Sequence, residues 1–142
     1  MARLIVVWLH VLAAAAWLGG VLYTSHLVVP ALARGERTYV ALLARARIVA
    51  WAAVGLLVVT GLENLRQVSL ERPWVMAKVL LAIVLLALAA HRDFALVPRA
   101  ARAIAAGSAP EAAVSGLRRL DRVLVLLGAL AIFLGVGIAR GR

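Results

Sequence analysis

Residues 71–94, ERPWVMAKVLLAIVLLALAAHRDF, have the composition of a membrane-spanning helix, with ionisable residues close to both ends of the apolar run. The uncharged run between Lys78 and His91 extends from Val79 to Ala90, which is twelve residues. At about 1.5 Å per residue this run covers about 18 Å, against about 30 Å for the hydrocarbon core of a bilayer. A helix that crosses the bilayer here therefore carries an ionisable side chain inside the membrane, and Lys78 is the candidate.

The bulk composition places the chain in a membrane. Its 142 residues are 65% hydrophobic, and a soluble domain of this length could not bury so much apolar surface. The net charge is +10, and fifteen of the sixteen basic residues are arginine. Because these arginines lie between apolar blocks, we expect them to fix topology and contact anionic headgroups, with no nucleic-acid partner. The chain has no cysteine, which excludes disulfides, iron–sulfur clusters and thiolate metal sites.

Four apolar segments predict an all-α fold, an integral membrane four-helix bundle. With a segment that leads into the membrane before the fourth span, the expected helices cover about residues 4–29, 39–65, 73–97 and 109–139. Pro30 and Pro98 are expected to end the first and third helices, because proline has no amide N–H. The first apolar run is longer than the core of a signal peptide, so we expect a retained helix. No internal repeat or linker is apparent, which predicts one transmembrane domain over residues 1–142.

The arginines are distributed unevenly between the two ends of the predicted bundle. Ten lie on the side of the first and third connections, namely Arg34, Arg37, Arg45, Arg47, Arg92, Arg99, Arg102, Arg118, Arg119 and Arg122. Five lie on the other side, namely Arg3, Arg66, Arg72, Arg140 and Arg142. Under the positive-inside rule this distribution predicts that both termini are on the outer side. The Ala-, Leu- and Arg-rich composition further suggests a multi-pass protein of a bacterial inner (cell) membrane.

His10 and Lys78 are expected at similar depth in the membrane. The first and third helices run in the same direction, with His10 about six residues into one and Lys78 about five residues past Pro73 in the other. His26 and His91 form a second pair of similar depth, turned largely away from an interface that contains the first pair. An ionisable side chain inside a membrane helix costs several kcal/mol, so it usually has a partner or a function.

Each of these residues has a functional and a structural interpretation. His10 is either an axial ligand of haem iron, through a neutral imidazole nitrogen, or bonds a backbone carbonyl of a neighbouring helix. Lys78 either pairs with a haem propionate or ligates as a neutral amine, or its ammonium extends to the outer headgroups. His26 and His91 are either solvated boundary residues or ligands of a second haem or metal site.

Trp17 and Arg47 are further candidate contacts of a cofactor. Trp17 follows His10 on the same helix face, where it could stack on a macrocycle or bond its polar edge. The fifteen uncharged residues between Arg47 and Glu63 cover about 22 Å, which is short of a full span. Arg47 therefore either reaches inward to an anionic group, such as a propionate or a lipid phosphate, or extends to the headgroups.

Three stretches resemble a known group of membrane proteins. They are WLHVLAAAAWLGGVLY (8–23), RARIVAWAAVGLLVVTGLENL (45–65) and PWVMAKVLLAIVLLAL (73–88). They are similar to proteins of the CopD domain and to the related four-helix protoporphyrinogen oxidases of the HemJ type, whereas the fourth helix resembles them only in general pattern. The resemblance implies that His10 and Lys78 belong to a b-type haem site. It also matches Trp17, Gly19 and Gly20 to a Trp-x-Gly signature, and Thr60-Gly61 to a Thr-Gly near the end of the second helix.

The sequence departs from the HemJ-type pattern at two places. Those proteins carry an arginine three residues after the position of Tyr23, where this chain has His26. The end of the fourth helix lacks their polar residues. Oxidation of protoporphyrinogen is therefore not carried over to this chain.

Three classes of function remain open at this point. The first is a haem b-binding membrane protein in redox chemistry or electron transfer, similar to a quinone-linked oxidoreductase, with quinone or another membrane redox protein as partner. The second is a copper transport protein, although copper(I) prefers Met and Cys and the chain has only Met76 besides the initiator. The third is a small accessory subunit of a respiratory or transport complex. Association into a homo-oligomer or a larger complex is compatible with each.

Overall fold

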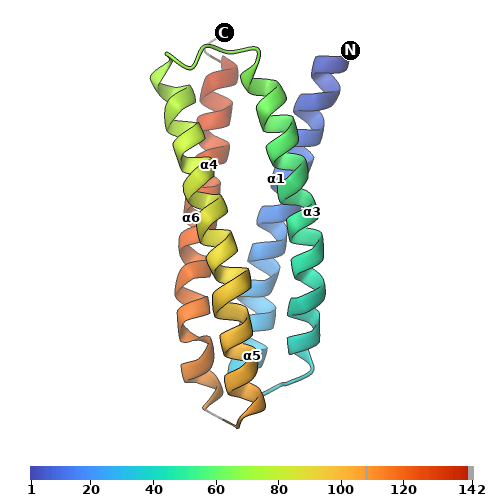
Figure 1. Cartoon of the computed structure of the whole chain (residues 1–142), viewed down its shortest axis with the longest axis vertical. Coiled ribbons are helices and arrows are strands. Elements are labelled where there is room, and N and C mark those ends of the chain that lie inside the picture. Colours follow the sequence, from blue (N-terminus) through green and yellow to red (C-terminus); the bar gives the residue numbers. More distant parts are fainter. Residues whose placement is uncertain (108, 141–142) are drawn as a thin grey trace.

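Four long helices form the protein, which is described here from a computed structural model covering residues 1–107 and 109–140 (Figure 1). The first span combines α1 (Ala2–Tyr23), a π-helical turn η1 (Thr24–Val28) and α2 (Val29–Ala33). The second is α3 (Tyr39–Leu65). The third combines α4 (Pro73–His91), a second π-helical turn η2 (Arg92–Leu96) and α5 (Val97–Ala105). The fourth is α6 (Pro110–Arg140).

All four spans are long and apolar enough to cross a membrane, with a mean hydropathy between 2.0 and 2.3 in their central windows. Large apolar side chains cover the outside of the bundle, for example Leu126, Ile48 and Phe133. In water this surface would be strongly unfavourable, whereas acyl chains solvate it. The prediction of an all-α membrane four-helix bundle is confirmed. Figure 1 shows that α1 begins and α6 ends at the same end of the bundle; the side of the membrane on which this end lies stays a prediction.

The first and third spans continue through Pro30 and Pro98, at which the sequence analysis ended them. Each proline lies in the first turn of the short helix that follows a π-helical turn. A proline inside an α-helix clashes with the carbonyl of residue i−4 and removes one hydrogen bond. The wider π-helical turn accommodates the extra residue immediately before the proline, so the span bends without ending.

The two halves of the chain repeat the same order of elements, which the sequence analysis did not detect. A long helix, a π-helical turn, a Val-Pro step and a short helix occur in each half, and the turns begin at Thr24 and Arg92, sixty-eight positions apart. A glycine with positive φ follows each short helix, Gly35 at 86° and Gly107 at 76°. No other residue in the described part of the chain has a positive φ. The bundle is therefore built from two similar helical hairpins.

Packing joins the helices as two pairs. The helix α1 packs mainly against α3, and α4 packs mainly against α6, as the two sides of the bundle in Figure 1 show. The helix α6 also contacts α1, α2 and α5, so it links the two pairs. The helices α1 and α4, which carry His10 and Lys78, are not one of the main contacting pairs.

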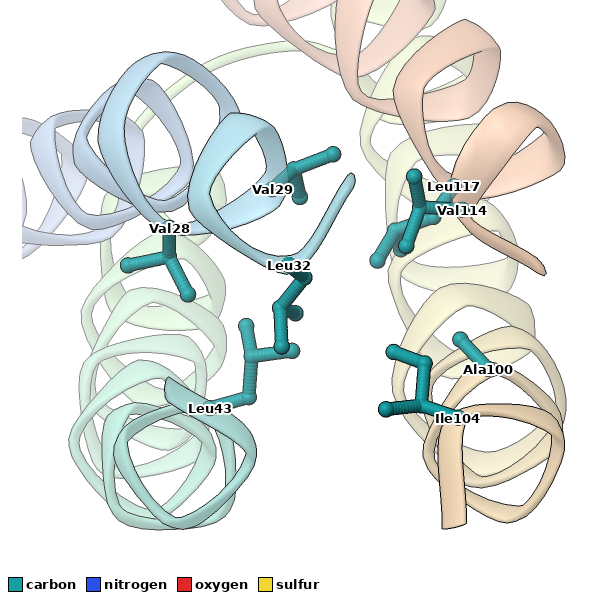
Figure 2. Close-up of a cluster of buried hydrophobic side chains, with 8 residues drawn as sticks. All are labelled: Val28, Val29, Leu32, Leu43, Ala100, Ile104, Val114 and Leu117. Atoms are coloured by element: carbon teal, nitrogen blue, oxygen red, sulfur yellow. The ribbon is translucent and has the colours of Figure 1, made fainter. Parts of the chain in front are cut away.

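Two hydrophobic clusters fill the bundle from the arginine-rich end to its middle. Figure 2 shows the first, to which η1, α2, α3, α5 and α6 contribute Val28, Val29, Leu32, Leu43, Ala100, Ile104, Val114 and Leu117. The second lies nearer the middle and contains Trp17, Val21, Val54, Leu85, Ala89 and Leu124. Neither cluster reaches the level of His10 and Lys78, which lie in the half of the bundle next to the termini.

Candidate functional site

The imidazole of His10 is held by a hydroxyl on α3. The Nδ1 atom of His10 lies 2.9 Å from Thr60 Oγ1, and the Thr60 hydroxyl donates its single proton to the carbonyl oxygen of Leu56 at 2.6 Å. Because that proton is already used, the Thr60 oxygen can only accept from His10, so Nδ1 must carry the hydrogen. In the neutral ring Nε2 then has a free lone pair. This is the tautomer that a metal ligand requires, and such ligands usually donate their other N–H to a nearby oxygen.

Gly61 gives this ring the space to lie against α3. A Cβ atom at Gly61 would be 3.4 Å from Cε1 of His10 and 3.9 Å from Nδ1. A Cβ atom at this position would therefore be in van der Waals contact with the imidazole, and a longer side chain would compete with the ring for this space. Thr60 thus supplies a hydrogen-bond acceptor for the ring, and the neighbouring Gly61 leaves room beside it.

Lys78 lies on α4 in the same half of the bundle as His10. Its side chain is partly buried, and its Nζ atom is 2.7 Å from the position that a Cβ atom would take at Gly135 on α6. Among the described residues, none of the ion pairs includes Lys78. The ammonium lies against α6, and the role of Lys78 stays a prediction.

Trp17 and Arg47 do not share the level of His10. Trp17 is 8% exposed in the middle cluster, seven residues from His10 and so about 10 Å further along α1. Arg47 precedes Thr60 by thirteen residues on α3, which is about 20 Å. Its guanidinium lies over the Phe94 ring, 5.7 Å from the centroid, and makes a long 3.5 Å hydrogen bond to the carbonyl of Asp93. The geometry therefore separates Arg47 from the pair formed by His10 and Lys78.

His26 and His91 are exposed at the other end of the bundle. The Nδ1 atom of His26 is 3.0 Å from the carbonyl oxygen of Leu22 on its own helix, and His91 ends α4 with an exposed side chain. In the described part of the chain, no group of three or more His, Asp or Glu side chains is placed to hold a metal ion. The three histidines do not form a common site.

A buried polar network beside the two π-helical turns was not anticipated from the sequence. The guanidinium of Arg92 donates to Asp121 Oδ1 at 2.5 Å, to Asp93 Oδ1 at 2.6 Å and to Thr24 Oγ1 at 2.8 Å. The indole of Trp51 donates to Asp93 Oδ2 at 2.9 Å. Asp121 is 0% exposed, Asp93 4% and Arg92 7%. The network draws one or more side chains from each of the four spans.

The sequence did contain a signal for this network. The chain has only six acidic residues, and Asp93 and Asp121 are two that lie next to arginines at the ends of apolar runs. From its position alone, Arg92 is expected to be a basic residue at the membrane boundary. An acid in such a basic setting indicates an internal partner for one of the arginines, because buried charges are paired.

A cavity of about 220 Å³ lies next to the network. Its walls come from all four spans, with Trp17 and Thr24 on the first, Arg47 on α3, Arg92 and Asp93 on η2, and Leu124 on α6. Most of the lining is apolar. The cavity and the His10 site are thus two separate polar regions along the bundle.

The family model described as copper resistance protein D (CopD) matches residues 40–138, which is more than half of the chain. The match covers nearly all of α3 to α6, including Lys78, and leaves α1 and His10 outside. Comparison with curated proteins and with solved structures gave no match. The resemblance to the CopD group is confirmed, and the chain belongs to the copper resistance protein D family of membrane proteins.

Proposed function

We propose that this CopD-family protein binds a b-type haem through Nε2 of His10 and serves electron transfer in the membrane. The observation that carries the proposal is the hydrogen bond from His10 Nδ1–H to Thr60, which leaves Nε2 unprotonated and fixes the direction of its lone pair. The resemblance to HemJ-type proteins supports the same residue. When bound, the haem iron would supply a one-electron redox centre.

The chemistry of the surrounding residues fits an anionic macrocycle. Lys78 adds a partly buried cation in the same half of the bundle as His10, and a haem propionate would offset this charge. Small buried side chains lie within one turn of the two residues, Ala13 beside His10 and Val75 beside Lys78. In this proposal His10 binds and orients the cofactor, Thr60 positions His10, and Lys78 holds a carboxylate.

The redox partner would be a membrane-soluble reductant or oxidant such as a quinone, or another membrane redox protein. Both residues of the proposed site belong to helices that are long and apolar enough to cross a membrane, and such molecules diffuse in the bilayer. The site is close to the terminal end of the bundle, which the arginine distribution assigns to the outer side.

Copper transport is the second candidate, and the description of the matched family favours it. His10 Nε2 could bind a copper ion in passage. The Lys78 ammonium disfavours a metal cation at this point, because two positive charges in a medium of low dielectric constant repel strongly. His26 and His91 are exposed at the opposite end, so they supply no second donor near His10.

A visible spectrum of the purified protein separates the candidates. We expect a Soret band that shifts on reduction with dithionite, that is lost in His10→Ala and that is retained in the matched control His26→Ala. Colourless protein that binds copper through His10 would contradict haem binding and support copper transport. Colourless protein that binds neither and co-purifies with a large complex would support an accessory subunit instead.

A further inference from the structure

The cavity next to the polar network opens between α1 and α3. The lining residues from the third and fourth spans are buried, with Ala89 at 5% and Leu124 at 0% exposed. The exposed lining residues belong to α1 and α3, namely Gly20, Tyr23 and Val49. The mouth therefore faces outward beside the first helical hairpin, with Thr24, Arg92 and Asp93 buried at the inner side and Arg47 half-buried between.

The repeat of the two hairpins explains why the space exists. Gly61 lies against His10 in the first hairpin, and Gly135 lies against Lys78 in the second. Equivalent residues of α3 and α6 are therefore seventy-four positions apart in the sequence. In this register Arg47 of the first hairpin corresponds to Asp121 of the second, while Thr24 corresponds to Arg92 at the start of the π-helical turn.

The two hairpins fill these equivalent positions differently. In the second hairpin the long side chain of Arg92 fills the interior and meets the carboxylate of Asp121. In the first hairpin the short Thr24 leaves a cavity, and the residue on the opposite helix is a cation, Arg47. The first hairpin thus has a cavity and a cation, Arg47, at the positions where the second hairpin has an ion pair. It lacks a carboxylate of its own there.

The carboxylates nearby are already used. Asp93 receives Arg92 on one oxygen and Trp51 on the other, and Asp121 receives Arg92 on both. None of the ion pairs formed by the described residues includes Arg47, whose one hydrogen bond is long and goes to a backbone carbonyl. Its guanidinium has five N–H donors, so most of them are available to a ligand in the cavity.

We propose that this cavity binds a long-chain amphiphile with a small anionic head, a carboxylate or a phosphate. Arg47 would pair with the head, the apolar walls would take the first part of the chain, and the rest would lie in the bilayer outside the mouth. A volume of about 220 Å³ equals the liquid volume of about seven water molecules, which suits a headgroup and its first methylenes. Pockets with apolar walls and a few convergent polar groups are the usual form of ligand sites.

A matched pair of brominated probes tests the charge requirement. Dibromostearate and its methyl ester have the same chain and differ in the head, and bromine quenches nearby tryptophan fluorescence. The protein in neutral detergent would carry Trp8→Phe and Trp74→Phe, which removes the two highly exposed tryptophans. This leaves Trp17, which lines the cavity, and Trp51, which is bonded to the lining residue Asp93. We expect half-saturation for the acid at a concentration at least tenfold lower than for the ester.

Variants on the same helices provide the controls. Arg47→Gln should remove the preference for the acid, whereas Arg45→Gln, two positions away and exposed, should keep it. Gly20→Leu should block the mouth and weaken both probes at least fivefold. Gly19→Leu should not, because Gly19 has equally open surroundings and does not line the cavity. This glycine pair decides the question if Arg47→Gln does not fold.

Equal quenching by acid and ester, or equal preference in Arg47→Gln and Arg45→Gln, would overturn the proposal. If the acid is preferred, a comparison of quenching by brominated phosphatidylglycerol and brominated phosphatidylcholine identifies whether the anionic head belongs to a membrane lipid or to a free acid. A tenfold preference for the glycerol lipid indicates a membrane lipid, and preference for the free acid alone indicates a diffusible carboxylate. His10→Ala should leave all these results unchanged, so the outcome is independent of haem binding.

Discussion

The hydroxyl of Thr60 determines what the imidazole of His10 can do. A threonine inside a helix normally returns its proton to a carbonyl one turn back, as Thr60 does to Leu56. This ordinary local bond has a consequence across the helix interface, because it leaves the Thr60 oxygen as an acceptor only. One hydroxyl therefore sets the tautomer of a ring that is fifty residues away in the sequence.

Thr60→Val tests this role, since valine has nearly the shape of threonine without the hydroxyl. We expect His10 to change from the Nδ1–H tautomer to a mixture, and haem affinity to fall about 10- to 100-fold, the usual effect of losing such a partner of a ligand. Nitrogen-15 NMR of labelled histidine reports the tautomer, and a spectral titration reports the affinity. Thr60→Ser keeps the hydroxyl and should behave as the wild type. An unchanged tautomer in Thr60→Val would contradict the assignment of the proton.

The π-helical turns are the elements that bring the buried charges together. Adjacent residues of an α-helix point about 100° apart, yet Arg92 and Asp93 are both buried in η2. The wider turn directs both side chains into the bundle, where Arg92 meets Asp121 of α6 and Thr24 of η1. The network thereby ties the two hairpins to each other at the level of their π-helical turns.

Asp121→Leu should remove the ion pair between Arg92 and α6. We expect a loss of about 3–5 kcal/mol in the free energy of unfolding, because Arg92 keeps its charge in a buried place and loses a partner. Asp121→Asn should lose less, since an amide oxygen can still accept from Arg92. Reversible unfolding in mixed detergent micelles measures both values. The control Glu111→Gln removes an exposed ion pair with Arg118 and should cost at most about 1 kcal/mol. Equal losses in Asp121→Leu and Glu111→Gln would show that the network does not stabilise the fold.

At the scale of the whole molecule, the sequence predicted the number and type of spans because these depend on local properties. A run of about twenty apolar residues can satisfy its backbone in lipid only as a helix, so length and composition suffice. The sequence does not predict in the same way which helices pack against each other. Side chains on any face of such spans are apolar, and nothing in the sequence indicated that α1 pairs with α3 and α4 with α6. The sequence did show acids beside arginines, but the helix pairing that brings Asp121 to Arg92 was not apparent from it.

The repeat of the hairpins is not apparent from the sequence, because the two halves carry different residues at their equivalent polar positions. Structural positions are kept, such as the Val-Pro steps and the glycines of positive φ, Gly35 and Gly107. At the equivalent polar positions the residue types differ, with His10 against Lys78 in the two odd spans. Few identities remain over the hairpins, and a comparison of letters does not detect them. Haem binding at His10 stays a prediction.

The distribution of arginines predicts how the whole bundle is oriented in the membrane. Arg92 is neutralised internally by two carboxylates, so it should not be counted with the free arginines of its end. Nine arginines then remain at that end against five at the other, and the expected orientation does not change. The cavity with Arg47 would lie near the cytoplasmic leaflet, which is rich in anionic lipids, and His10 near the outer one.

Cysteine labelling can test this orientation without background, because the chain has no cysteine of its own. Ser69→Cys lies in the exposed connection between α3 and α4, and Thr38→Cys lies in the exposed connection before α3 at the arginine-rich end. In intact cells of a bacterial host, a membrane-impermeant maleimide should label Ser69→Cys at once and Thr38→Cys only after permeabilisation. The reverse pattern would place the arginine-rich end outside. The Arg47 cavity would then open to the outer leaflet, and a diffusible carboxylate would become a better ligand for it than a cytoplasmic-leaflet lipid.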